Sequence, residues 1–112
     1  MASQWMKEVN FAVTVCDESA QILEMNDKAA KTFERFGGKA LIGKSLYDCH
    51  NPNSQKKISE LLASGRSNTY TIAKSGVKKL IHQTPWHRDG LLAGLVEISI
   101  EIPLEMPHFQ RD

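Results

Sequence analysis

Phe11-Ala-Val-Thr-Val-Cys-Asp-Glu-Ser-Ala-Gln-Ile-Leu-Glu-Met-Asn-Asp-Lys-Ala-Ala-Lys-Thr-Phe-Glu-Arg-Phe36 is the stretch that decides the fold. Residues 11–16 are rich in β-branched side chains, and the turn-forming residues 17–20 separate them from a second apolar run over 21–25. This pattern predicts a hairpin of two strands. Asn26 then caps a predicted helix that continues at helical spacing to Gly37 and Gly38.

The chain beyond this stretch predicts further elements that complete one domain. Ser45 can begin a single helical turn, and Asn51-Pro52-Asn53-Ser54 is typical of a helix start, so a second helix is expected over about 54–64. Three β-rich runs follow over 68–74, 77–86 and 91–102. Ser75-Gly76 and Arg88-Asp89-Gly90 separate them with hairpin-turn chemistry, which predicts an antiparallel meander.

The order of elements predicts an α+β domain over residues 11–102. Five antiparallel strands form the sheet, and the helices inserted between the second and third strands lie on one face. Such an insertion creates a cavity between helices and sheet, which is the default ligand site. Residues 1–10 are expected to form an N-terminal amphipathic helix with Ser3 as its cap, and residues 103–112, with two prolines, an extended C-terminal tail.

Composition and charge exclude several classes of protein. The chain has 112 residues, 41% hydrophobic and 24% charged, which suits one globular domain. The formal charge of +1 leaves no basic excess for nucleic acid. No apolar run approaches the roughly 20 residues of a membrane helix, and the N-terminus lacks a secretion signal. We therefore expect a soluble cytoplasmic protein, with Cys16 and Cys49 as reduced thiols.

Three segments resemble PAS sensor domains. Asp17-Glu-Ser-Ala-Gln-Ile-Leu-Glu-Met-Asn-Asp-Lys-Ala29 is similar to the turn, strand and helix start of that family. Leu41-Ile-Gly-Lys44 is similar to a second family segment, and Trp86-His-Arg-Asp-Gly90 with Ala93-Gly-Leu-Val96 to the final hairpin. They occur in the family's order over residues 9–102. The resemblance implies a PAS-like five-stranded antiparallel sheet with helices on one face, in a module that senses a ligand, cofactor or partner and commonly dimerises.

The resemblance also suggests two candidate cofactors, flavin and haem. Flavin-binding PAS domains that respond to blue light need a cysteine shortly after the position of Gly43, where this chain has Leu46, with Cys49 three residues later. Haem-binding PAS domains hold iron through a histidine on the helix near 54–64, which contains none, so His50 is the one candidate. We expect no assured cofactor, with haem and flavin as minor alternatives.

Strand alternation predicts which side chains reach the cavity. Leu80, His82 and Trp86 share one face of their strand, which we expect to point inward. His82 would then either hydrogen-bond a ligand or be a core histidine with a partner on a neighbouring strand, and both alternatives stay open. In the last strand, the face of Val96 and Ile98 is expected to meet the core. The residues predicted to line the pocket are Phe33, Leu46, His50, Ile58, Leu62, Tyr70, His82, Trp86 and Val96.

The remaining expectations concern partners and chemistry. The histidines and cysteines have no recognised metal-ligand spacing, so no metal is expected. Trp5, Met6 and Val9 form an apolar stripe that predicts a homodimer. The leading hypothesis is a non-enzymatic sensory or signalling module that binds a small molecule or a protein partner and signals in trans. The alternative is a small enzyme that uses His82 as acid or base.

Overall fold

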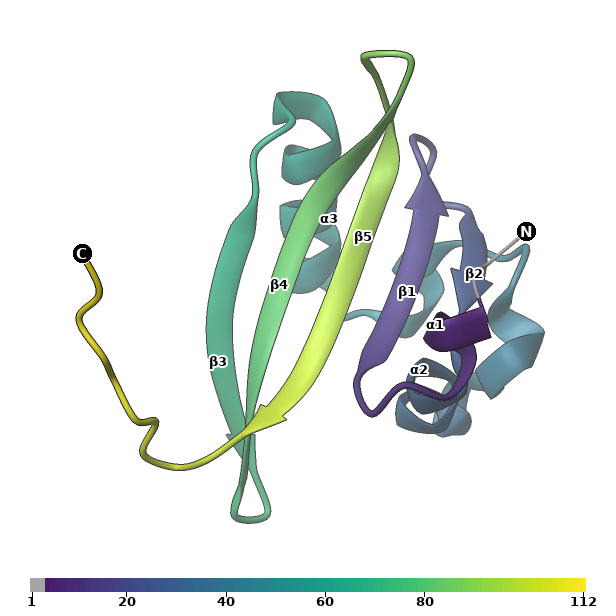
Figure 1. Cartoon of the computed structure of the whole chain (residues 1–112). Helices are drawn as coiled ribbons and strands as arrows, with labels where there is room; N and C mark the ends of the chain where they lie inside the picture. The colour runs from purple at the N-terminus through teal and green to yellow at the C-terminus, as the bar shows by residue number, and fades with distance from the viewer. Residues whose placement is uncertain (1–3) are drawn as a thin grey trace.

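The computed structural model describes residues 4–112 and contains the predicted sheet. The five strands are all paired antiparallel in the order β2-β1-β5-β4-β3 (Figure 1). The strands are β1 (Ala12–Asp17), β2 (Ile22–Met25), β3 (Asn68–Lys74), β4 (Val77–Arg88) and β5 (Leu91–Ile102). The helices are α1 (Gln4–Glu8), α2 (Asp27–Thr32) and α3 (Pro52–Ser64), with 3-10 turns η1 (Glu34–Phe36), η2 (Gly38–Leu41) and η3 (Leu46–Cys49). The predicted α+β fold class is confirmed.

The sheet has two unlike faces. Helices α2 and α3 and the 3-10 turns cover the inner face, whereas α1 lies on the opposite, outer face (Figure 1). The main core lies in the inner layer, where side chains of α3 and of the turns pack against β1, β2 and β5. Its most deeply buried members are Cys16, Ile22, Ile58, Leu61 and Leu95. Both predicted helices therefore lie on the same side of the sheet, as expected.

Asn26 attaches the first hairpin to α2. Its Oδ1 accepts hydrogen bonds from the backbone N–H groups of Ala29 and Val13, both at 3.0 Å, and its Nδ2 donates to the carbonyl of Phe11 at 2.8 Å. The expected cap is thus present, and the same side chain also binds β1. The helix itself is shorter than predicted: it ends at Thr32 and tightens into η1 before Gly37, whose φ of 118° is left-handed.

Both predicted turns of the meander form as two-residue hairpins. Ser75 and Gly76 have φ values of 54° and 77°, and Asp89 and Gly90 have 52° and 81°. Paired left-handed residues match the twist of antiparallel strands, which explains the sharp connections. Residues 103–112 run away from the sheet as an extended tail (Figure 1). Ser3, expected to cap the first helix, lies outside the described residues. Among those described, no helix is both long and apolar enough to cross a bilayer.

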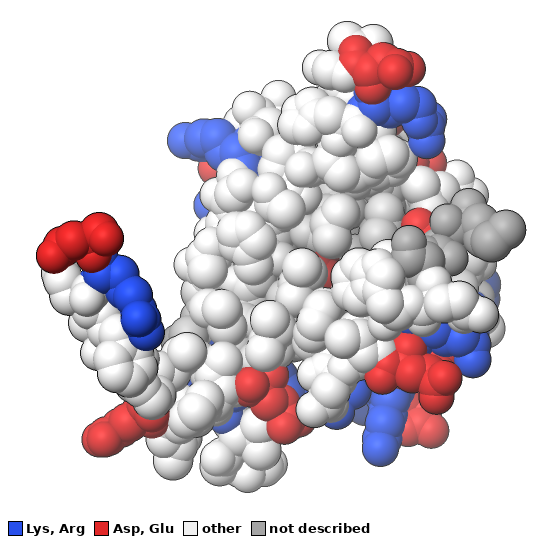
Figure 2. All heavy atoms as spheres, in the orientation of Figure 1, with Lys and Arg blue, Asp and Glu red and all other residues white. Residues whose placement is uncertain are grey.

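The faces of β4 and β5 are opposite to the prediction. Ile81 and Glu97 face the helices in the inner layer, while Trp86, Val96 and Ile98 face outward. The prediction assumed that the more apolar face would be the covered one. In this sheet the covered face carries polar side chains that bond one another across strands. The apolar outer face is only partly covered by α1, and Figure 2 shows it largely free of charge, with charged groups around its rim.

Candidate functional site

A cavity of about 190 Å³ lies between the inner face of the sheet and the helical layer. Four strands, the end of α2 and the loop that joins η3 to α3 contribute to its walls. Its position matches the cavity that the order of elements predicted. The lining residues are Ala12, Thr14, Thr32, Phe33, His50, Tyr70, Ile72, Lys79, Ile81, Glu97 and Ser99.

A row of polar side chains crosses the sheet beside this cavity. Asn68, Gln83 and Glu97 are register partners on β3, β4 and β5, so their side chains point to the same face. Asn68 Nδ2 donates to Gln83 Oε1 at 2.9 Å, and Gln83 Nε2 donates to Glu97 Oε2 at 2.8 Å. Gln83 is buried, and the Glu97 side chain is only 13% exposed. The strand register thus places the Glu97 carboxylate in the inner layer, where the buried amide of Gln83 donates a hydrogen bond to it.

His50 faces this carboxylate from the helical layer. Its Nε2 lies 4.0 Å from Glu97 Oε2, and its side chain is 12% exposed. The ring is held from behind, because Nδ1 lies 2.8 Å from the carbonyl oxygen of Leu46. The loop is fixed in turn by Gln55 Nε2, which donates to the carbonyls of His50 and Tyr47, both at 2.9 Å. Phe33 packs on the imidazole with 5.7 Å between ring centroids.

The charge of Glu97 acts on neighbouring groups. Burial, and then the negative charge of Glu97, raise the pKa of the Tyr70 hydroxyl above its usual range. Burial and the same carboxylate also raise the pKa of the Cys49 thiol to about 11. Both effects disfavour a second negative charge in this region. The site therefore combines a negative end with aromatic and aliphatic walls.

The structure brings together only part of the predicted pocket. Phe33, His50 and Tyr70 line the cavity. Leu46 and Ile58 belong to the adjoining core, and Leu62 packs against that core. Trp86 and Val96 line the outer groove, and His82 shares that face by strand alternation. The prediction that these three side chains line the inner cavity is therefore corrected. The sequence reasoning missed Gln83 and Glu97. The sequence carried no signal that pairs them, because the register that places Gln83 opposite Glu97 includes an irregularity between Trp86 and His87 that the turn alone does not predict.

His82 has a protein partner on the outer face. Its Nδ1 lies 2.7 Å from Thr69 Oγ1, the hydroxyl of its register partner on β3. One of the two expected alternatives was a histidine with a hydrogen-bond partner on a neighbouring strand. That partner is present, but it lies on the outer face of the sheet and not in the core. It does not reach the inner cavity, so the acid or base role that the enzyme hypothesis assigned to it has no support in this geometry.

A larger apolar groove, about 540 Å³, lies between α1 and the outer face of the sheet. Trp5 and Met6 form its wall on the side of α1, and Trp5 packs near Phe11 with 6.4 Å between ring centroids. Val9 of the predicted stripe is half-buried. The sheet contributes six apolar residues and two charged ones, namely Val13, Val15, Leu23, Trp86, Val96 and Ile98 together with Glu24 and Arg88.

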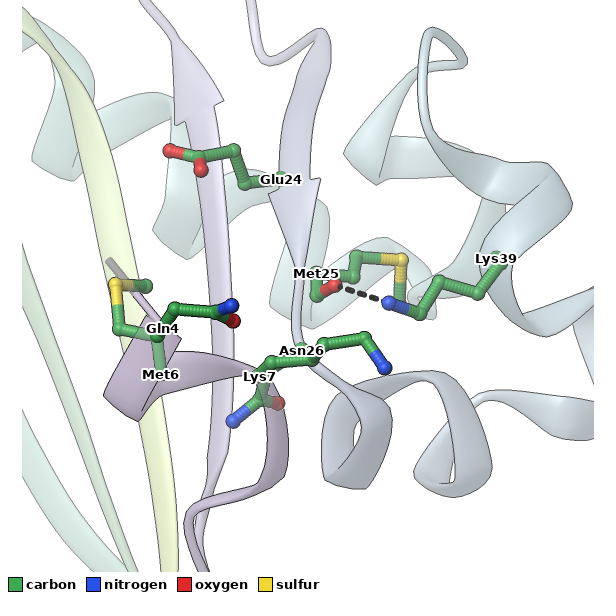
Figure 3. Close-up of a pocket in the computed structure, with 7 residues that line it drawn as sticks. All are labelled: Gln4, Met6, Lys7, Glu24, Met25, Asn26 and Lys39. Atoms are coloured by element: carbon green, nitrogen blue, oxygen red, sulfur yellow. Dashed lines mark hydrogen bonds between the residues drawn. The ribbon is translucent and has the colours of Figure 1, made fainter. Parts of the chain in front are cut away.

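A third hollow, of about 240 Å³, separates α1 from β2 and η2 (Figure 3). Both of its lysines have partners within the chain. Lys39 Nζ donates to the carbonyl of Met25 at 3.0 Å, as Figure 3 shows, and lies 3.3 Å from Asp27 Oδ1. Lys7 lies 3.8 Å from the same carboxylate. These contacts attach α1 and η2 to α2 and account for the two lysine charges without a ligand.

The inner cavity is small for haem or flavin. Its volume of about 190 Å³ lies below the roughly 300–1,000 Å³ of pockets for drug-sized ligands. The Cys49 thiol is buried and donates to the carbonyl of Leu46 at 3.3 Å, and its raised pKa keeps it protonated. Within residues 4–112, no three His, Cys, Asp or Glu side chains are grouped to hold a metal ion.

Comparison with known proteins shows a PAS-like fold. No protein-family model matches the sequence, and the curated proteins yield no match. Among solved structures, the PAS domain of the histidine kinase ThkA matches with a TM-score of 0.64 at 19% identity, over 80% of this chain and 97% of that one. The Aer2 receptor from Vibrio cholerae, described as a dual PAS-haem oxygen sensor, gives 0.61 at 18% identity, over 83% and 95%. The VqmA dimer from Vibrio cholerae gives 0.69 at 15% identity, over 93% and 53%.

Proposed function

We propose that this chain is a sensory module that binds a small molecule in the inner cavity and acts as a homodimer. The observation that carries the proposal is the pair of polar side chains, Glu97 and His50, that face the cavity from opposite layers. A small apolar cavity with a few placed polar groups is typical of a ligand site.

Strand β5 gives a physical route for the signal. Glu97 and Ser99 line the inner cavity, while Val96 and Ile98, which alternate with them, line the outer groove beside α1. A ligand that shifts this strand therefore changes the inner and outer faces together. The proposed output acts in trans, through whatever packs on the outer face.

A second copy of the chain is the proposed occupant of that outer face. The groove is apolar and continuous with the exposed α1, and charged residues gather at the rim of the face (Figure 2). Apolar surfaces of this kind are typical of interfaces. The VqmA structure, which has a similar fold, is a dimer, and this supports the same expectation here.

Ligand-detected NMR with a panel of single-ring fragments tests the cavity. The decisive variant is Ser99→Phe, which places a ring inside it, and Ser99→Ala is the matched control that leaves it open. We expect fragments to bind the wild type and Ser99→Ala but not Ser99→Phe. Equal binding of the same fragments to all three proteins would show that the cavity is not the site.

A further inference from the structure

Two polar groups, Glu97 and His50, face each other at the cavity, and with a neutral imidazole both present hydrogen-bond acceptors there. A carbonyl oxygen only accepts, so the 2.8 Å contact of His50 Nδ1 with Leu46 O requires the proton to be on Nδ1. In the neutral imidazole, Nε2 then carries a lone pair. That lone pair faces Glu97 Oε2 at 4.0 Å, too far for a direct hydrogen bond. The pair lacks a donor between its members.

The Glu97 carboxylate is also short of donors on its own side. An ionised carboxylate offers about four acceptor positions. Gln83 Nε2 fills one of them at Oε2, and among residues 4–112 no lysine or arginine forms an ion pair with Glu97. Lys79 lines the same cavity but lies on β4 four residues from Gln83, roughly 13 Å along the strand. The carboxylate end of the cavity therefore favours a positive charge.

The rest of the cavity limits what can carry that charge. Phe33, Tyr70 and Ile81 give it aromatic and aliphatic walls. Its volume of about 190 Å³ suits a single small ring, since pockets for drug-sized ligands are roughly 300–1,000 Å³. A flat group with several N–H donors is suited to a carboxylate, because parallel N–H···O bonds to a charged acceptor are stronger than neutral ones.

We propose that the inner cavity takes a small organic cation with at least two N–H donors, such as an amidinium or a primary ammonium compound. One N–H group binds Glu97 and another binds His50 Nε2, so that the ligand supplies the donor missing between them. The inference rests on the proposed function, since it names the class of ligand for the same cavity.

Three probes with the same ring and different charge test the class. Benzamidine is a cation, benzamide is neutral and benzoate is an anion, and each is titrated into ¹⁵N-labelled protein of residues 1–112. We expect benzamidine to shift the backbone amides of cavity residues and to bind at least tenfold more tightly than benzamide, the size of effect typical of a hydrogen bond to a charged group. Benzoate should leave these amides unshifted.

Two glutamates on β5 provide matched variants. Glu97→Gln should remove the preference for benzamidine, whereas Glu101→Gln, at an exposed position on the same strand, should keep it. The order of the three probes on the wild type decides the question even if Glu97→Gln does not fold. Tighter or equal binding of benzoate or benzamide would overturn the cationic class while leaving the cavity as a ligand site. If these probes shift no cavity amides and the fragment panel shows no binding, the proposed function itself fails.

Discussion

The indole Nε1 of Trp86 donates a hydrogen bond to the carbonyl oxygen of Cys16 at 2.9 Å, and the ring crosses β5 to reach it. Trp86 lies on β4 and Cys16 on β1, and the residue between them on β5 is Gly94, the register partner of Trp86. Only a residue without a side chain leaves room for this crossing. The contact joins three strands on the outer face and directs the Trp86 ring away from the inner cavity.

Gly94→Ala should therefore be strongly destabilising. A Cβ at this position would collide with the backbone carbonyl oxygen of Cys16 and approach the Trp86 ring nitrogen to 2.7 Å. Since backbone cannot move aside without breaking the sheet, we expect a loss of about 3 kcal/mol in the free energy of unfolding, measured by urea denaturation. Gly76→Asn is the control, because nothing lies within 4 Å of a Cβ there and asparagine tolerates left-handed φ. Similar stability of Gly94→Ala and wild type would contradict this account of the crossing.

Asn26→Ala should cost more than an ordinary helix cap. The side chain is buried and satisfies three backbone groups, those of Phe11, Val13 and Ala29. Removing it leaves backbone donors and an acceptor unpaired in the layer between β1 and α2, for an expected loss of about 2–4 kcal/mol. Asn51→Ala is the matched control, because that exposed asparagine caps α3 through one bond to Ser54, and its loss should cost only about 1 kcal/mol. Equal losses of unfolding free energy in Asn26→Ala and Asn51→Ala would show that the bonds of Asn26 to Phe11 and Val13 add nothing to the helix cap.

The stability of the fold should fall between pH 9 and pH 11. Burial raises the pKa of both Cys16 and Cys49 from 9.0 to about 11. The unfolded thiols thus lose protons near pH 9 while the folded ones retain them, so rising pH favours the unfolded state. Each cysteine should remove on the order of 1 kcal/mol by pH 10 and nothing below about pH 8.

Comparison of urea unfolding at pH 8 and pH 10 measures this effect. Cys16→Ala and Cys49→Ala should each show a smaller loss of stability than wild type over the same interval, since all other titrating groups are shared. A wild-type protein and a double variant with the same pH dependence would show that the thiols titrate normally in the folded state.

The outer face should hold two copies together. Ile98→Asp places a charge in the apolar groove and should convert a dimer into a monomer in light scattering, without loss of the fold. Deletion of residues 1–9, which removes α1 and its Trp5 and Met6 side chains, should have the same effect. Leu104→Asp, on the exposed tail, is the control and should leave the mass unchanged. A monomeric wild type, or an Ile98→Asp variant that remains dimeric, would rule out this interface.

Purified protein should show no absorption above the aromatic band. The cavity is small for a macrocycle, and the raised pKa of Cys49 disfavours the thiolate that flavin addition requires. A Soret band that disappears in His50→Ala would instead assign haem to this site. Light-dependent bleaching that requires Cys49 would assign flavin.

The elements and their order could be predicted from the sequence because their signals are local. Ser75-Gly76 and Asp89-Gly90 tolerate the left-handed φ values of tight hairpins, and Asn26 and Asn51 cap helices through residues three positions away. The helix expected up to Phe36 was too long because its last turn forms 3-10 bonds that end at a glycine pair. Such choices depend on small differences between neighbouring geometries.

Only the tertiary structure decided which face of the sheet the helices cover. Alternation shows that Glu97 and Ser99 share one face and that Val96 and Ile98 share the other, but it does not say which face is inner. The apolar face was the natural choice for the core, and it was wrong. Glu97 can lie in the inner layer because Gln83 donates a hydrogen bond to it and Asn68 donates one to Gln83. The register of three strands, β3, β4 and β5, places these side chains next to one another. A polar cluster of this kind depends on contacts between distant residues, which no local pattern contains.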